Sequence, residues 1–118
     1  MLKLSCNPEE LIVGGWRSDK ERTLGEWVYP SPENRLKAEP LHNRLFGKLT
    51  WRFSKTTCSS TFDEMQWRQR YRAVWSNNDK LFLIFGPKKN QECQLITFID
   101  EDTLWVYSGK NIEYFTRI

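Results

Sequence analysis

His42 is the only histidine of the chain, and imidazole is the side chain best suited to proton transfer or metal binding near neutral pH. It stands in a stretch that is interrupted by prolines, after Tyr29-Pro30-Ser31-Pro32 and Glu39-Pro40. No second imidazole is present to share a metal ion or to complete a catalytic relay. We therefore expect no catalytic or metal-binding role for His42.

Acidic and thiol groups are the next candidates for chemistry. Asp100-Glu101-Asp102 stands between two strand-like segments, where such residues usually form a solvated turn rather than a cation site. Cys58 lies among small hydroxyl residues, which is typical of a strand with a small polar inner face, and Cys6 and Cys93 are too distant for a C-x-x-C motif. Neither a phosphate-binding glycine loop nor a G-x-S-x-G elbow occurs. The sequence predicts no catalytic residues, no metal and no cofactor, and hence no enzyme.

A row of guanidinium groups is the most distinctive charge pattern. Three arginines recur at every second position, at Arg68, Arg70 and Arg72, so a strand would place them on one face. Cations beside aromatic rings can bind single-stranded nucleic acid, but Trp67, Tyr71 and Trp75 alternate to the opposite face, where they could not stack bases next to the arginines. Two interpretations stay open: a solvated face opposite acidic neighbours, or a surface for an acidic protein partner.

Short strands follow one another after Gly47 and would position these residues. Apolar and polar residues alternate, and Gly, Pro, Asn and Asp cluster at the breaks. The expected strands cover residues 11–18, 48–55, 56–63, 65–76, 81–85, 94–99, 103–107 and 112–117. Connections this short favour antiparallel neighbours in chain order, and closing the meander removes exposed edges. In 81–85, 103–107 and 112–117 both faces are apolar, so their inward positions stay open.

Between residues 20 and 46 the alternation disappears. Prolines interrupt this segment and leave room for one short helix near 20–27 and another near 41–46. We interpret it as an insertion after the first strand of a single domain that spans residues 1–118. A chain of this length can bury a core without a metal or a disulfide.

Composition limits the partners. Aromatic residues make up 14% of the chain, with six Trp and seven Phe, which suits a β-rich interior. The net charge is +3, from 18 Lys and Arg against 15 Asp and Glu, without a polybasic arm, so no nucleic-acid partner is expected. No stretch approaches the roughly 20 apolar residues of a membrane span.

The first residues lack the apolar core of a secretory signal, and the expected location is the cytoplasm. Leu4-Ser5-Cys6 is faintly similar to a lipoprotein cleavage box, although nothing hydrophobic precedes it. Whether a lipoprotein signal has been removed upstream stays open.

Two short motifs at the ends of the strand series carry a resemblance. Gly14-Gly15-Trp16-Arg17 opens the first strand and Arg117 closes the last, and together with the strand series they resemble a lipocalin or calycin barrel, in particular small bacterial lipocalin-like domains of unassigned role. The resemblance implies a closed, antiparallel, eight-stranded up-and-down barrel of the all-β class. It also implies that Gly14, Trp16 and Arg117 close one end of the barrel, with the tryptophan as a plug and the arginine packed across it. A ligand would then enter at the opposite end, near residues 20–46.

The insertion is similar to the helix-turn-helix lid of intracellular fatty-acid-binding proteins. The chain departs from that family in two respects. Pro30, Pro32 and Pro40 crowd the expected helices, and the last strand lacks the Arg-x-Tyr pair that holds a lipid carboxylate there.

The barrel interior is the remaining functional candidate. The residues expected to face it and to contact a ligand are Trp51, Phe53, Phe62, Gln69, Tyr71, Ile96 and Phe98. Their rings either fill the barrel or line a pocket. Our leading hypothesis is non-enzymatic binding of a small, mostly apolar ligand, oriented by a few polar groups. The alternative is a protein-interaction module with a filled barrel, which uses either the three arginines or residues 20–46.

Overall fold

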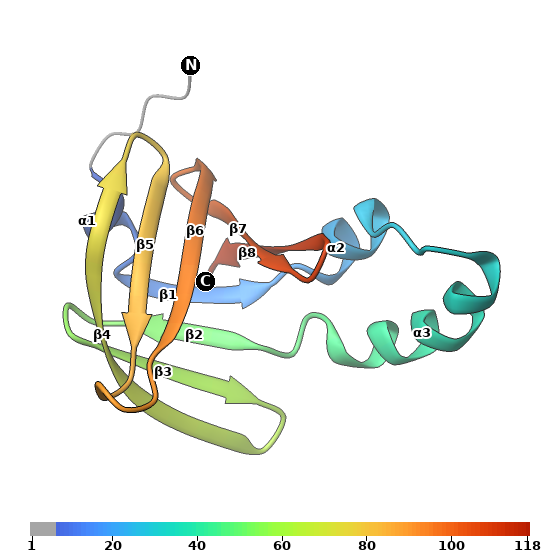
Figure 1. Ribbon diagram of the computed structural model, residues 1–118, viewed down its shortest axis with the longest axis horizontal. Coiled ribbons are helices and arrows are strands. Elements are labelled where there is room, and N and C mark those ends of the chain that lie inside the picture. Colours follow the sequence, from blue (N-terminus) through green and yellow to red (C-terminus); the bar gives the residue numbers. More distant parts are fainter. Residues whose placement is uncertain (1–6) are drawn as a thin grey trace.

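Within residues 7–118, which the computed structural model describes, eight strands form a closed barrel (Figure 1). The strands are β1 (Gly14–Ser18), β2 (Thr50–Phe53), β3 (Thr57–Phe62), β4 (Met65–Asn77), β5 (Lys80–Phe85), β6 (Glu92–Asp100), β7 (Thr103–Ser108) and β8 (Asn111–Arg117). Neighbours follow chain order and pair antiparallel, and β1 closes the ring by pairing with both β2 and β8. The predicted all-β up-and-down barrel is confirmed. Leu4-Ser5-Cys6 lies outside the described residues.

A short helix, α1 (Pro8–Leu11), precedes β1 and corrects the expected strand over 11–18. Asn7 caps it, since its side-chain oxygen accepts a hydrogen bond from the Glu10 amide at 3.0 Å, and Pro8 occupies the first turn, where a missing N–H costs nothing. The chain reaches extended conformation only at Gly14. The apolar residues before it, Leu11 and Ile12, are buried against the end of the barrel.

Two helices, α2 (Lys20–Glu26) and α3 (Pro32–Leu45), occupy the insertion. The predicted helix near 20–27 is confirmed, but the one expected near 41–46 is too short. Ser31 caps α3 by accepting a hydrogen bond from the Asn34 amide at 3.0 Å, and Pro32 starts its first turn. Pro40 lies inside the helix. The prolines therefore begin α3 or are accommodated within it, rather than breaking it.

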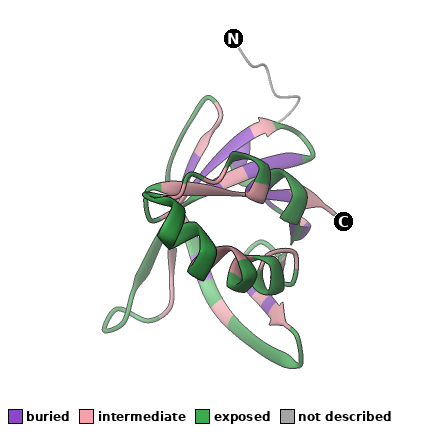
Figure 2. Cartoon of the chain, turned by 90° about the vertical axis from the view of Figure 1, so that its right-hand side faces the viewer, coloured by how far each residue is buried: buried purple, intermediate pink, exposed green. Residues whose placement is uncertain are grey.

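The insertion, residues 20–46, projects from the barrel as an arm (Figure 1). In Figure 2 the two helices of the arm are mostly exposed and most buried residues lie in the barrel, although Thr23 of α2 is also buried. α3 buries none of its own side chains. The base of the arm is held by Asn111, which accepts a hydrogen bond from the Val28 amide at 2.8 Å and donates one to the Val28 carbonyl at 3.1 Å.

Strand register decides which residues fill the barrel. Leu81 and Leu83 of β5 are fully buried, so Phe82 faces outward. On β7 and β8 the inward residues include Leu104 and Phe115, which are opposite one another. These assignments identify the inward-facing residues of the strands whose two faces are equally apolar in sequence.

A β-bulge in β4 corrects one expected orientation. The pairing with β5 shifts between Ala73 and Trp75, so Val74 is inserted and Trp75 lies opposite the outward-facing Phe82. Trp75 is 49% exposed. It therefore lies on the outer face, the side of the arginines, and not on the inner side with Tyr71 as alternation alone predicts.

Among the described residues, no helix has both the length and the apolar composition needed to cross a membrane.

Candidate functional site

The closed end of the barrel is built around Trp16. This side chain is fully buried, packs on Phe98 with ring centroids 5.9 Å apart, and donates its indole N–H to the Ile12 carbonyl at 2.9 Å. The Arg117 guanidinium lies 4.2 Å from the Trp16 ring centroid, within the range of a cation–π contact. Gly14 has a φ of +130°, and a Cβ there would stand 2.9 Å from Arg117 Nη1. The structure thus brings together the three residues that the resemblance places at this end.

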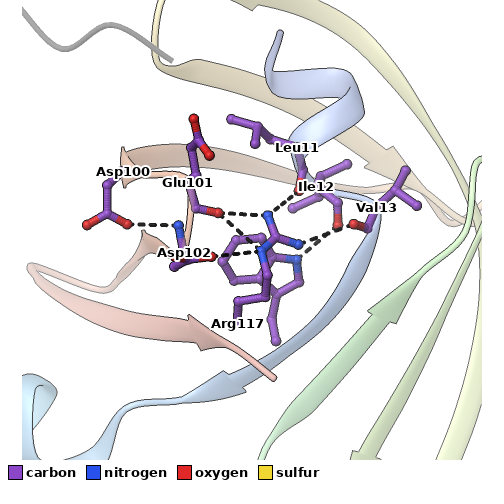
Figure 3. A network of polar contacts seen from close by, with 8 residues as sticks. Leu11, Ile12, Val13, Asp100, Glu101, Asp102 and Arg117 are labelled. Atoms are coloured by element: carbon purple, nitrogen blue, oxygen red, sulfur yellow. Dashed lines mark hydrogen bonds and ion pairs between the residues drawn. The ribbon is translucent and has the colours of Figure 1, made fainter. Parts of the chain in front are cut away.

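Arg117 ties three segments together (Figure 3). It donates hydrogen bonds to the carbonyls of Leu11 at 2.8 Å and Val13 at 3.3 Å, and through Nη2 to the Glu101 carbonyl at 2.7 Å. An ion pair with Asp102 adds a contact at 3.3 Å. The arginine therefore links β8 to the residues before β1 and to the turn between β6 and β7.

Asp100-Glu101-Asp102 forms that turn, where Asp100 accepts a hydrogen bond from the Asp102 amide at 2.8 Å. In the part of the chain that the structure describes, no three His, Cys, Asp or Glu side chains come together in a way that could hold a metal ion. The turn therefore carries the structural contacts of Arg117.

Four of the expected ligand-contacting residues are core. Phe53, Tyr71, Ile96 and Phe98 are all buried. Phe53 and Tyr71 meet edge to face with centroids 5.1 Å apart, and the Tyr71 hydroxyl donates to the Ser54 carbonyl. Together with the fully buried leucines, these side chains fill the half of the barrel next to Trp16.

A pocket of about 150 Å³ opens at the other end of the barrel, where β2 begins and the arm is attached. Its apolar walls include Trp51, Trp67 and Phe85. Its polar lining includes Ser60, Gln69, Gln94 and the acidic side chain of Glu92. Of the residues expected from sequence, only Trp51 and Gln69 line this mouth pocket.

Trp51 forms the floor between the pocket and the core. It stacks on Phe115 with centroids 4.1 Å apart and an interplanar angle of 11°. Phe62 does not line the pocket; it lies near the tip of the β3–β4 hairpin, with the Lys48 ammonium 6.0 Å from its ring centroid. Trp67 and Phe85 were missing from the expected set. Trp67 shares its face with Gln69 by simple alternation, so the signal was present in the sequence.

Cys58 lines the pocket but is a poor nucleophile. Its side chain is 3% exposed, and burial raises the pKa of the thiol to about 11, an effect that the contact with Ser60 offsets only in part. A thiol with this pKa is neutral near pH 7, whereas the thiolate is the reactive species. Cys58 is one of the small polar residues that the sequence predicts on the inner face of β3, and this explains why it lines the pocket.

Glu113 is an inward-facing acid that the sequence analysis missed. It pairs across strands with the buried Val106 and alternates along β8 with the inward Phe115, which was the available signal. Ser18 donates a hydrogen bond to Glu113 Oε2 at 2.6 Å and accepts one from the Gly47 amide at 3.1 Å. Burial raises the pKa of the Glu113 carboxyl above its ordinary value, and the hydrogen bond from Ser18 lowers it in part.

The raised pKa of Glu113 predicts a pH-dependent stability. A carboxyl with a higher pKa in the folded state adds stability at low pH, and this contribution is lost as the pH rises from the ordinary pKa of 4.5 through the raised value. Glu113→Gln removes the titration, so the variant should gain in unfolding free energy relative to the parent between about pH 4 and about pH 8. Urea unfolding at the two pH values measures the difference. Parallel pH profiles for parent and variant would show that Glu113 titrates normally.

The remaining candidates lie away from the mouth pocket. His42 sits inside the arm, where it contacts Trp27 with ring centroids 4.8 Å apart, and its Nδ1 is 3.1 Å from the Tyr29 hydroxyl. Arg68, Arg70 and Arg72 are exposed on the outer face of β4, as alternation predicts. Neither His42 nor any of the three arginines lines the mouth pocket.

Compared with known protein families, curated proteins and solved structures, the chain shows no significant match to any of them.

Proposed function

We propose that this chain is a non-enzymatic, lipocalin-like binding protein that takes the apolar end of a small molecule into its mouth pocket. The observation that supports this proposal is the division of the barrel. Side chains fill the half around Trp16, whereas the end that carries the arm holds a pocket with aromatic walls and amide and hydroxyl groups. Pockets of this composition bind mostly apolar ligands and orient them through a few polar contacts.

The size of the pocket restricts the ligand. A cavity of about 150 Å³ in a protein interior is known to hold a molecule the size of benzene. One ring or a short branched chain therefore fits between Trp51 and Phe85. The rest of a longer ligand would extend outward past the polar side chains of Gln69 and Gln94.

The polar groups around the pocket suit binding better than catalysis. Ser60, Gln69 and Gln94 donate or accept hydrogen bonds but do not titrate near neutral pH. Burial favours the protonated thiol of Cys58, whose hydrogen-bond partners are the Ser60 hydroxyl at 3.9 Å and the backbone of Arg52. Glu92, whose acidic side chain also lines the pocket, is exposed to solvent, so an apolar group can enter without burying it.

Filling the pocket tests the proposal. Ser60 is buried on the inner face of β3, so Ser60→Leu places apolar volume in the mouth, whereas Ser59→Leu adds the same volume to the outer face. We expect p-cresol, a ring with one hydroxyl, to shift the side-chain amide NMR signals of Gln69 and Gln94 in the parent and in Ser59→Leu. The shifts should be lost in Ser60→Leu. In a separate measurement without added p-cresol, native mass spectrometry of the freshly purified protein should detect a copurified small molecule.

The decisive comparison is between the two leucine variants, after circular dichroism has shown that both are folded. Equal p-cresol shifts in both variants, or none in the parent at millimolar probe, would overturn binding at the mouth.

The expected cytoplasmic location and bacterial source remain predictions from the sequence alone.

A further inference from the structure

A second surface, remote from the mouth pocket, is strongly basic. The outer face of β1 to β4 carries five exposed arginines, here called the arginine face: Arg17, Arg52, Arg68, Arg70 and Arg72. Strand register places Arg52 opposite Ser59 and Ser59 opposite Arg68, so the three form one row across the sheet. Arg70 lies opposite Thr57 in the next row. Hydroxyl groups thus separate the guanidinium groups at the centre of the face.

No carboxylate neutralises the centre of this face. Strands β2, β3 and β4 contain no Asp or Glu, and the acids nearest in sequence, Asp63 and Glu64, occupy the hairpin tip. Asp63 is paired there with Lys48 at 3.2 Å. The ion pairs found among residues 7–118 do not include any arginine of the face. The acidic neighbours that one interpretation of the sequence required are therefore not beside Arg68 and Arg70.

The edge of the arginine face, at Arg72, is less basic than its centre. Arg72 borders a groove that is also lined by Glu9 and Glu10 of α1, beyond ion-pair distance. Local acids therefore temper the positive potential at Arg72 but not at Arg52, Arg68 and Arg70. The centre of the face is the part that attracts an anionic partner.

We propose that the arginine face binds an extended acidic segment of a partner protein. Alternate residues of a strand are about 7 Å apart, so Arg68 and Arg70 match the spacing of alternate carboxylates in an extended peptide. Guanidinium groups bind carboxylates through two parallel hydrogen bonds. The Ser59 hydroxyl lies between Arg52 and Arg68, whereas the Thr57 hydroxyl already accepts a hydrogen bond from Arg68 at 3.4 Å. Because the arginines are exposed and have no acidic partner at the centre, binding breaks no existing ion pair there.

An acidic peptide fits the face better than a nucleic acid does. Single-stranded nucleic acids need aromatic platforms beside the cations, and the positions of β3 opposite Arg68 and Arg70 hold Ser59 and Thr57. The bulge brings Trp75 to the outer side of β4, but it lies beyond Arg72 and near the β4–β5 turn. One ring at the edge offers no stacking surface along the row.

A charge-reversal pair with a matched control tests the proposal. The probe is a fluorescein-labelled peptide of alternating Ser and Glu, followed by fluorescence anisotropy at low ionic strength. Arg68→Glu/Arg70→Glu changes the centre of the face, and Lys37→Glu/Lys110→Glu changes net charge equally at exposed sites on α3 and on the β7–β8 turn. We expect at least about a tenfold loss of affinity in the first variant and less than about a twofold change in the second. Affinity in the parent should fall as salt is added.

Three results would overturn the proposal. The first is an equal loss in both charge variants, which would mean that only net charge matters. The second is no binding by the parent at low salt. The third is tighter binding of oligothymidylate, or of vesicles with anionic lipids, than of the peptide, with the same dependence on Arg68 and Arg70. Because Ser60→Leu leaves the arginine face intact, it should bind the peptide like the parent, so failure here is distinguishable from failure of the mouth proposal.

Discussion

Replacing Trp16 by alanine is expected to lower the free energy of unfolding by about 3–5 kcal/mol. The side chain is fully buried and packs on Phe98, so its removal leaves a large cavity at the closed end. The substitution also deprives the Ile12 carbonyl of its indole donor and the Arg117 guanidinium of its aromatic partner. Three losses at one position explain why this change should be among the most damaging in the barrel.

Urea unfolding followed by circular dichroism measures this loss. Trp75→Ala is the control, because it removes the same side chain from a half-exposed position on the outer face. Its cost should stay below about 1 kcal/mol. If the two variants had similar midpoints, Trp16 would not be the plug of the barrel.

Arg117→Met is expected to cost about 2–3 kcal/mol. Methionine keeps the length of the side chain but donates no hydrogen bond, so the carbonyls of Leu11 and Glu101 lose a charged donor in a partly buried region. Arg117→Lys should recover only part of the loss, since one ammonium cannot reproduce the planar fork that reaches both carbonyls over the Trp16 ring.

Asp102→Asn separates the ion pair from the carbonyl contacts. The Asp102 side chain is 80% exposed, so its pairing with Arg117 should contribute less than about 1 kcal/mol. Thermal unfolding of the three variants side by side orders the contributions. A loss in Asp102→Asn as large as that in Arg117→Met would assign the stabilisation to the ion pair instead.

Alternation identified the eight strands and their order, because half-buried strands carry the same period as the barrel wall. It failed at Trp75, since a bulge adds one residue without a change in composition and reverses every later orientation on that strand. Alternation also missed α1, and the second helix of the insertion was expected to begin later in the chain than α3 does. In both cases Pro follows a capping residue, Asn7 or Ser31, which marks a helix start rather than a break.

The mouth pocket was only partly predictable. Sequence period tells which face of a strand points inward but not how deep a position lies, and depth depends on side chains that other strands contribute across the barrel. Phe53 and Trp51 share one face of β2, yet Phe53 is core and Trp51 borders the pocket. Glu113 was overlooked because the inward face of residues 112–117 was left open, so its carboxyl was not assigned to the barrel interior.

The exposure of α3 affects how the sequence of this chain can change during evolution. Since α3 buries no side chain and Leu36 is 79% exposed, folding of the barrel places little constraint on what those positions contain. The entropy of closing the connection between β1 and β2 grows only slowly with its length, so longer or shorter versions would cost the barrel little. The sequence and length of α3 can therefore change with little effect on the stability of the barrel. In the arm, structural restraint falls on the attachment of α2, where the buried Thr23 accepts a hydrogen bond from the Tyr114 amide, so any restraint on the exposed positions of α3 would have to come from a binding partner.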